Sequence, residues 1–373
     1  MTSEADVLVV GGGPVGLAIA IEAGVRGLDV ALIEPRVGTV DKACGEGLMP
    51  GAVEALTRLG VHPVGHPLEG IRYRDARRSV DHRFVGRVGL GVRRTTLHDA
   101  LARRADDLGI VRHAGRVNGL AQDGEGVVVT VSAVNTLVVP GDFEAKNSHA
   151  FPSIESPTVT MRARWLLAAD GLHSAVRRLV GASRASLLPR HRRRFGVRTH
   201  FQVEPWTSLV EVYWSEGGEA YVTPVDKNLV GVAMLGAPGL NFSAQLASIP
   251  SLAERLADAA IVGSVRGAGP LDQRTRSRVV GRVLLVGDAA GYVDALTGEG
   301  LRVGFAQAHA AVDAIISAAP QSYERAWARA TRDYRILTRG LVAVAVSPLR
   351  RAIVPSAAAM PGVFGSVIER LAR

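Results

Sequence analysis

The chain has 373 residues, of which 42 are glycine and 18 are proline, and 47% are hydrophobic against 21% charged. This composition excludes disordered and fibrous classes, and the length suffices for two domains or one large interleaved domain. The single cysteine, Cys44, excludes a disulfide framework and a cysteine-rich zinc module. No stretch reaches the roughly 18 apolar residues of a membrane span and no secretion signal is recognisable, so we expect a cytoplasmic protein without an integral membrane segment.

The charge balance is basic, with 44 basic and 35 acidic residues and a formal net charge of +9. Only three of the basic residues are lysines, and the arginines are spread along the chain. Their one dense run, residues 190–194, is interpreted as a solvated surface segment, with a site for an acidic partner or ligand as the alternative. We expect no nucleic-acid partner.

The first elements form one βαβ unit. A short apolar run at 6–10 predicts a strand, a glycine turn follows at 11–16, and apolar spacing at 14–26 predicts a helix. Residues 29–33 predict a second buried strand.

The later patterns mix strands and helices, which indicates an α/β protein. Further strands are predicted at 127–131, 159–161, 165–169 and 283–286, and helices at 51–59, 95–108 and 301–317. Between 195 and 236 the runs at 197–203, 209–214, 220–223 and 229–234 predict an antiparallel sheet that covers another layer. Prolines from residue 334 onward predict short helices rather than one long helix. Residues 135–157 are rich in turn formers and suggest an insertion or a poorly ordered loop.

The strongest local motif is the glycine turn after the first predicted strand. Gly11, Gly13 and Gly16 stand in the order G-x-G-x-x-G. Gly11 permits the tight turn, Gly13 lets the backbone approach a pyrophosphate, and Gly16 allows the helix to pack closely on the strand. The helix N-terminus adds free N–H donors for the phosphates. In this strand–turn–helix context the glycines predict a dinucleotide site.

Glu34 ends the second predicted strand. A carboxylate at this place accepts hydrogen bonds from ribose hydroxyls and repels a ribose 2′-phosphate. The site should therefore hold FAD or NAD rather than NADP, although Arg36, two residues later, leaves NADP open.

Two later segments carry a family resemblance. Residues 168–177 (AADGLHSAVR) and 285–291 (LVGDAAG) resemble the A-D-G-x-x-S-x-x-R and G-D motifs of the flavoprotein family built on the p-hydroxybenzoate hydroxylase fold. With the glycine turn, the three motifs occur in the family's order across residues 8–304. The resemblance implies FAD as cofactor and an α/β fold, in which a Rossmann-like FAD-binding domain is interleaved with a mixed or antiparallel β-sheet substrate domain and followed by C-terminal helices.

The resemblance also implies cofactor contacts. In the family the aspartate matching Asp288 hydrogen-bonds the ribityl chain of FAD, and the stretch matching 296–302 lies against the flavin ring, where a helix starting near Leu301 would aim free N–H groups at the ring. Arg94 matches a helix-start arginine on the phosphate side, and Asp170, with Arg177, either contacts FAD or ties the two halves of the protein together. The predicted FAD contacts are Gly11, Gly13, Pro14, Gly16, Glu34, Arg36, Arg94, Asp170, Asp288, Gly298, Gly300 and Leu301.

Residues 42–48 (KACGEGL) depart from the aromatic hydroxylases of this family. They are similar to the K-x-C-G-G-G-L stretch of the geranylgeranyl reductase branch, in which the cysteine lies near flavin and substrate. Cys44 is therefore the catalytic candidate, and a small buried hydrophobe is the alternative. Trp214, Tyr221 and Pro224 are the substrate-pocket candidates, although residues 221–224 match the Y-x-W-x-F-P strand of the reductases only in part.

Other site classes find little support. His62 and His66 are spaced like a helical metal pair, but Pro63 and Gly65 break the helix that such a pair needs, so we predict no metal site. No lysine follows a glycine as a Walker A motif requires, and no G-x-S-x-G elbow occurs.

The resemblance favours a monooxygenase that hydroxylates an apolar aromatic or polyketide-like small molecule. FAD would be reduced by NADH or NADPH docking transiently, or by a separate flavin reductase, and would react with O₂ to a C4a-hydroperoxide in a pocket that excludes water. The alternative is a flavin-dependent C=C reductase of prenyl chains, with Cys44 as proton donor. The W-x-W-x-I-P motif of flavin halogenases does not occur in this sequence, which counts against halogenation. The non-enzyme alternative is a flavin-bearing binding module.

The motifs also suggest a discontinuous domain organisation. We expect the FAD-binding domain to comprise residues 1–70, 94–182 and 275–320. The substrate-binding sheet domain would comprise 71–93 and 183–274, and residues 321–373 would form a C-terminal helical region.

Overall fold

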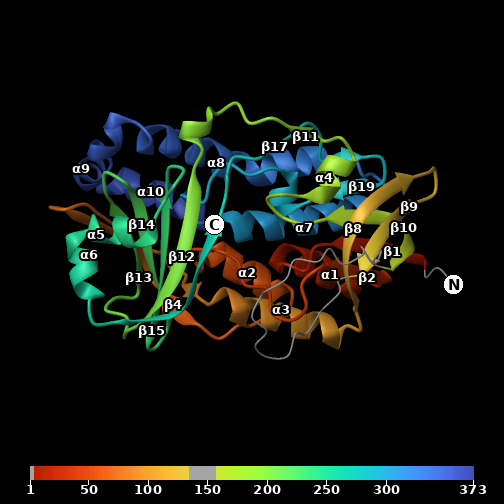
Figure 1. The fold of residues 1–373 in the computed structure, drawn as a ribbon, viewed down its shortest axis with the longest axis horizontal. Coiled ribbons are helices and arrows are strands. Elements are labelled where there is room, and N and C mark those ends of the chain that lie inside the picture. The colour runs from red at the N-terminus through yellow and green to blue at the C-terminus, as the bar shows by residue number, and fades with distance from the viewer. Residues whose placement is uncertain (1–3, 134–156) are drawn as a thin grey trace, which may run out of the picture.

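The computed structural model describes residues 4–133 and 157–373. The insertion predicted at 135–157 lies outside these ranges apart from Pro157. Figure 1 shows two sheet regions side by side, with long helices beside both.

The first sheet has seven strands in the order β1-β2-β8-β9-β10-β19-β18, and β1 also pairs directly with β10. Its parallel centre places β1 between β2 and β10, with β8 beyond β2 and β19 beyond β10. β9 is antiparallel to β8 and β10. The strands are β1 (Glu4–Val10), β2 (Val30–Glu34), β8 (Val111–Gln122), β9 (Val127–Ala133), β10 (Thr158–Ala168), β18 (Val279–Val280) and β19 (Val283–Leu285).

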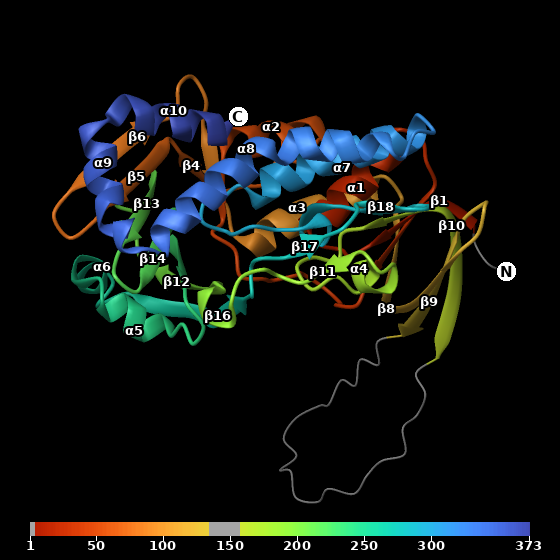
Figure 2. The same ribbon diagram turned by 90° about the horizontal axis from the view of Figure 1, so that it is seen from above.

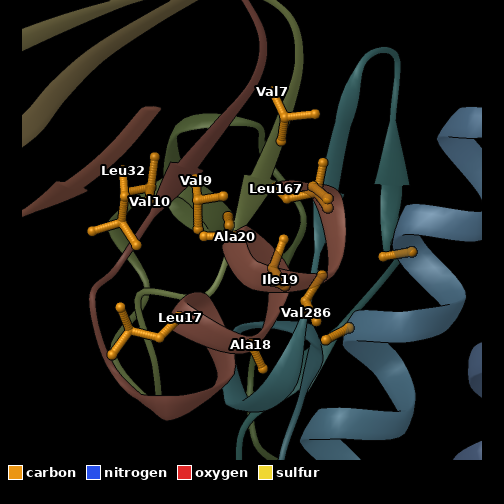
Figure 3. Packing of buried hydrophobic residues seen from close by; sticks show 14 of the residues in the cluster. Val7, Val9, Val10, Leu17, Ala18, Ile19, Ala20, Leu32, Leu167 and Val286 are labelled. Carbon is orange, nitrogen blue, oxygen red and sulfur yellow. The ribbon is translucent and has the colours of Figure 1, made fainter. Parts of the chain in front are cut away.

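Helices cover this sheet because its central parallel strands contain buried apolar runs, such as Val7–Val10 in β1 and Leu166–Ala168 in β10. Every residue of β2 is buried, as expected for a parallel strand covered on both faces. Figure 3 shows Val7 and Val9 packed with Ile19, Leu167 and Val286 in this core. The helices of this region are α1 (Pro14–Val25), α2 (Pro50–Arg58), α3 (Arg94–Asp107), α4 (Ala175–Leu179) and α7 (Gly300–Ile316).

The second large sheet has the order β16-β12-β15-β14-β13-β5-β6 and is antiparallel except between β5 and β13. The predicted antiparallel sheet between 195 and 236 is thus present, and it recruits strands from both sides. Its strands are β5 (Gly70–Arg74), β6 (Ser79–Arg83), β12 (Phe195–Gln202), β13 (Leu209–Trp214), β14 (Gly218–Asp226), β15 (Leu229–Gly236) and β16 (Ala260–Ala268).

Smaller elements join the two large sheets. One small sheet contains β3 (Gly47–Leu48), β7 (Gly89–Gly91) and β4 (His66–Leu68), and another contains β11 (Ser183–Arg184) and β17 (Arg274–Thr275). The remaining short helices are α5 (Phe242–Ala247), α6 (Pro250–Arg255), η1 (Arg190–Arg192) and η2 (Gly287–Ala290).

The C-terminal region is helical: Tyr323 and Trp327 at its start are buried in the core of the first sheet, and its later helices pack on the second sheet (Figure 2). It contains α8 (Ser322–Ala345), η3 (Pro348–Ala352), α9 (Ile353–Ala359) and α10 (Pro361–Ala372). The prediction of short helices from residue 334 is wrong for its first part, because α8 continues to Ala345 and buries Tyr334 and Thr338 on one face. Pro348 and Pro361 begin separate short helices as predicted, whereas Pro355 lies inside α9.

Two strand predictions also merge. Residues 159–161 and 165–169 belong to the single strand β10, which stays continuous because it pairs with β9 in its first half and with β1 along most of its length.

No single helix among the described residues is long and apolar enough to cross a membrane. The pair Ser322–Ala345 and Pro348–Ala359 meets that test only jointly, across a bend of 102°.

Candidate functional site

A cavity of about 820 Å³ extends between the two large sheets. One part is walled by the glycine turn, the end of β2 and residues after β19, including Gly11, Glu34 and Asp288. The other part is walled by the second sheet and α10, including Val212 and Ile368. The cavity therefore connects the predicted dinucleotide site with the predicted substrate sheet.

The glycine turn is shaped for a phosphate group. Gly11 has φ +107°, and a Cβ on it would lie 2.5 Å from the Ala169 carbonyl oxygen. A Cβ on Gly16 would lie 1.7 Å from the Gly11 carbonyl oxygen, so helix and strand touch there. Gly13 differs, because a Cβ on it would meet only the Arg94 guanidinium, at 3.8 Å. Helix α1 begins beside this open space without a side-chain cap, which leaves N–H donors for an anion.

Cations gather beside this cradle. Arg94 and Lys42 both line the cavity, and the Lys42 ammonium lies near Gly171, where a Cβ would be 3.3 Å from Nζ. Burial lowers the pKa of Lys42, and the neighbouring Arg36 and Arg94 lower it further. The same region contains Asp288, whose pKa burial raises although the cations oppose that change. An anionic ligand would relieve the repulsion between these cations.

Glu34 lies at the end of β2, as predicted, but its carboxylate already has partners. Oε2 accepts from the Gly12 N–H at 2.7 Å, and Oε1 accepts from Arg36 Nε at 2.6 Å. Burial alone would raise the pKa of Glu34, but the hydrogen bonds from Arg36 and Gly12 outweigh it and lower the pKa. A ribose bound here would share the carboxylate with Arg36.

Asp170 and Arg177 mainly join segments of the chain. Asp170 Oδ2 accepts from the Ala175 and Val176 N–H groups at 2.7 and 3.1 Å, while its Oδ1 has no partner within the described residues. The Arg177 guanidinium donates to the carbonyls of Asp288 and Leu172 at 3.2 and 2.8 Å. Asp170 lines the cavity, whereas Arg177 holds the segment after β19 in place.

The glycine-rich segment before α7 forms the middle of the cavity wall. Gly298 and Gly300 line it, and α7 begins at Gly300 with its N-terminal end toward the cavity. The Tyr221 hydroxyl donates to the Leu296 carbonyl at 2.7 Å, which ties the substrate sheet to this segment. Glu299 next to it is buried, and burial raises its pKa to about 7 despite a salt bridge with Arg302.

Cys44 lines the cavity, two residues after Lys42 and three before Gly47, where a Cβ would lie 3.5 Å from Val210 on β13. It is half-buried, and its sulfur accepts the Glu46 N–H at 3.4 Å. Gly45, Glu46 and Gly47 line the cavity with it. The Tyr292 phenol lies close enough to Cys44 to interact with it electrostatically. Burial keeps the pKa of this phenol well above its usual value.

The substrate part of the cavity is apolar. Its lining residues on β5, β13 and the C-terminal helix α10 include Ile71, Tyr73, Val210, Val212, Ile368 and Leu371. Of the predicted pocket residues, Tyr221 lines the cavity. Trp214 packs on Tyr73 with ring centroids 5.5 Å apart, and the Pro224 carbonyl is pressed against Gly91, so neither is among the lining residues.

Several lining residues were not predicted from sequence. Lys42 and Glu46 flank Cys44 in the sequence, and their closeness to a predicted site residue is the signal that could have identified them as lining residues. Tyr73, Tyr292 and Ile368 come from separate elements and have no local motif. Within the described ranges, no group of three histidine, cysteine, aspartate or glutamate side chains is placed to hold a metal ion.

Comparison with known proteins identifies relatives along most of the chain. A family model described as FAD binding domain matches residues 4–324. A menaquinone reductase from Mycolicibacterium smegmatis is 28% identical over 358 residues, covering 88% of this chain and 80% of the relative. A digeranylgeranylglycerophospholipid reductase from Methanosarcina mazei is 28% identical over 322 residues, covering 81% of this chain and 72% of the relative.

Solved structures share the fold. A p-nitrophenol 4-monooxygenase from Pseudomonas putida aligns with a TM-score of 0.77 at 18% identity, covering 100% of this chain and 97% of that chain. A flavin-dependent brominase aligns with a TM-score of 0.79 at 16% identity, covering 99% and 94%. The fold is that of p-hydroxybenzoate hydroxylase, and FAD is the cofactor. The chain therefore belongs to the FAD binding domain family and is an FAD-dependent oxidoreductase.

Proposed function

We propose that this oxidoreductase reduces a carbon–carbon double bond in an apolar, prenyl-type chain. The observation that carries the proposal is that Cys44 lines the same cavity as the phosphate cradle and the apolar residues of β5, β13 and α10. Two relatives that span most of the chain are named as reductases, of menaquinone and of a geranylgeranyl phospholipid. The sequence resemblance alone favoured hydroxylation. The relatives and the place of Cys44 favour reduction.

The cofactor would be held along the first part of the cavity. Gly13 and the start of α1 would take the diphosphate, Arg94 and Lys42 would neutralise it, and Glu34 would accept from the ribose. Asp288, Gly298, Gly300 and Leu301 would lie along the remainder, as the sequence predicts. When bound, FAD supplies the redox chemistry: it takes two electrons from NADH or NADPH and passes them on as a hydride to one alkene carbon.

The protein's own residues would complete the addition. The hydride would form a C–H bond at one alkene carbon. The Cys44 thiol would donate a proton to the other alkene carbon, and the resulting thiolate would take up a proton from solvent. The apolar wall of Ile71, Val212 and Ile368 would hold the chain and keep water away. Tyr73 and Tyr292 stay protonated because burial raises the pKa of each phenol.

Hydroxylation of an apolar aromatic molecule is the second candidate, favoured by the fold shared with a p-nitrophenol 4-monooxygenase. The same enclosed apolar part would then protect the oxygen-transfer step from water. In that reaction O₂ is consumed with product, and Cys44 has no required role.

One experiment separates the two. The purified flavoprotein is reduced anaerobically with NADH or NADPH and given a menaquinone or a geranylgeranyl lipid, and products are analysed by mass spectrometry. Reduction of the alkene adds two hydrogen atoms to the isoprenoid chain without O₂, and this mass gain persists after any quinol has been reoxidised in air. If product appears only after air is admitted and carries an oxygen atom from labelled O₂, the enzyme is a monooxygenase. If neither NADH nor NADPH reduces the flavin directly, but reduction occurs once a flavin reductase is added, a separate reductase is the electron source.

A further inference from the structure

Glu46 adopts a backbone conformation that side chains rarely take. Its φ is +60°, and Ala318 is the only other non-glycine residue of the described chain with a positive φ. Glu46 is also buried, at 3% exposure. A glycine would fit this turn without strain, so the glutamate side chain has to be held by its surroundings.

The Glu46 carboxylate is held by two elements from different parts of the fold. Oε1 accepts the N–H of Arg94, the first residue of α3, at 2.8 Å. Oε2 lies 2.6 Å from Nε2 of His200 on β12. Gly231 on β15 leaves the necessary room, because a Cβ there would lie 2.9 Å from Oε2. The carboxylate thus bridges the FAD-side helix and the substrate sheet.

His200 is itself oriented by a buried arginine. Its Nδ1 lies 3.3 Å from an Arg198 guanidinium nitrogen, and because a guanidinium only donates, Nδ1 accepts. The ring proton is then on Nε2 and is donated to Glu46. Arg198 also binds Asp41 at 2.5 Å and the Lys42 carbonyl at 3.2 Å. The chain of contacts runs from Asp41 through Arg198 and His200 to Glu46.

The backbone around Glu46 sets the direction of the thiol. The Glu46 N–H donates to Cys44 Sγ at 3.4 Å, and the Glu46 carbonyl accepts from the Val92 N–H at 2.9 Å. The Thr223 hydroxyl donates to the Gly45 carbonyl at 2.8 Å. A change in the Glu46 side chain would therefore be transmitted directly to Cys44.

We propose that Glu46 is a positioning residue. Supported by its contacts with His200 and Arg198, Glu46 holds the turn that presents the Cys44 thiol to the cavity, and it couples that turn to Arg94. The use of the thiol as a proton donor rests on the proposed function. The positioning itself does not, and it can be measured without a substrate.

The test uses the fact that Cys44 is the only cysteine in the chain. Alkylation by iodoacetamide therefore reports on this thiol alone, and flavin fluorescence reports FAD affinity. Glu46→Gly keeps the backbone conformation but removes the carboxylate. Since hydrogen bonds to a charged group are lost, we expect the alkylation rate to rise on the order of tenfold and FAD affinity to fall. Glu46→Gln keeps the side-chain volume and one acceptor oxygen, so it retains only one of the two contacts and should give values between those of Glu46→Gly and wild type.

A second variant approaches the carboxylate from the other side. Gly231→Ala places a methyl group against Oε2, and it should mimic Glu46→Gly even if the latter fails to fold. In the double variant Glu46→Gly/Gly231→Ala, the methyl group no longer clashes, so it should add nothing. Ala318→Gly is the matched control, because it relieves a φ of +50° after α7, and it should leave both readouts unchanged.

Wild-type alkylation and FAD affinity in both Glu46→Gly and Gly231→Ala would overturn the positioning role. Equal changes in Glu46→Gln and Glu46→Gly would also overturn it, because the acceptor oxygen that glutamine retains would then make no difference. If the readouts change as expected but no alkene is reduced, the positioning stands and the proposed function fails.

Discussion

The hydroxyl of Tyr221 on β14 donates a hydrogen bond to the carbonyl of Leu296 in the segment before α7, at 2.7 Å. This contact joins the middle of the substrate sheet to the loop that forms the wall beside Gly298 and Gly300. The loop is also held from behind by α8, where the Thr338 hydroxyl lies 2.9 Å from that of Thr297. Side chains from two regions thus fix one short loop from opposite sides.

Tyr221→Phe should weaken this connection. The Leu296 carbonyl loses its donor, and we expect a loss of about 1 kcal/mol in the free energy of unfolding. The flavin should remain bound, because the cradle at Gly13 is untouched. Urea denaturation of both proteins measures the loss, and flavin absorbance after gel filtration checks retention. Unchanged stability would show that the contact contributes nothing.

Gly13→Val should abolish FAD retention. Gly13 has φ −73° and ψ 174°, which valine adopts without strain, so its effect would come from side-chain volume beside the cradle. The measurement is the ratio of flavin to protein absorbance after purification. Gly340→Ala is the control, since a Cβ there has no neighbour within 4 Å among the described residues. Full flavin occupancy in Gly13→Val would refute the phosphate cradle.

Cys44→Ser should separate the two candidate reactions. If the thiol donates the proton, we expect alkene reduction to slow by about two orders of magnitude, the lower range for a general acid. Reduction of the flavin by NADH or NADPH should be unaffected, and stopped-flow absorbance tests this half-reaction alone. An unimpaired alkene reduction would remove Cys44 from the chemistry.

Glu299→Gln should change how stability depends on pH. The pKa of Glu299 is raised by burial from 4.5 to about 7, so between these values the folded protein retains a proton that the unfolded chain has released. Wild-type stability therefore falls as pH rises through this window, by at most about 1.4 kcal/mol per pH unit for this group. The glutamine variant lacks this penalty.

Thermal or urea unfolding at pH 5, 6, 7 and 8 measures this difference. The stability of Glu299→Gln relative to wild type should increase with pH and level off above the pKa of about 7. Asp294, whose pKa burial raises to about 6, remains in both proteins and cancels in the comparison. A difference that is constant across the series would contradict the raised pKa of Glu299.

The sequence alone predicted the first strand, glycine turn, helix and second strand, because these signals are local. The G-x-G-x-x-G turn needs a strand before it and a helix after it, and these lie within thirty-four residues. β1, α1 and β2 form where their apolar periodicity predicts. Glu34 was predicted from its place at the end of the second strand, and Asp288 from the resemblance of residues 285–291 to the G-D motif.

Local patterns were weaker for the C-terminal helices. Pro348 and Pro361 mark the starts of new helices, but Pro355 lies inside α9, and nothing local showed that α8 would run through Tyr334. Its length is set by burial of Tyr334, Thr338 and Ala345 against distant segments. Similarly, Trp214 and Tyr221 carry equal pocket signals in the sequence, and only packing places Tyr221 on the cavity and Trp214 behind Tyr73.

What the tertiary structure decided is the set of contacts between segments far apart in the chain. Glu46 and His200 are separated by 154 positions and share a hydrogen bond of 2.6 Å. No sequence motif predicts this pair, because no characteristic spacing along the chain relates the two residues. Short-range backbone geometry determined the cofactor turn, whereas the surroundings of Cys44 were determined by how the substrate sheet packs against it.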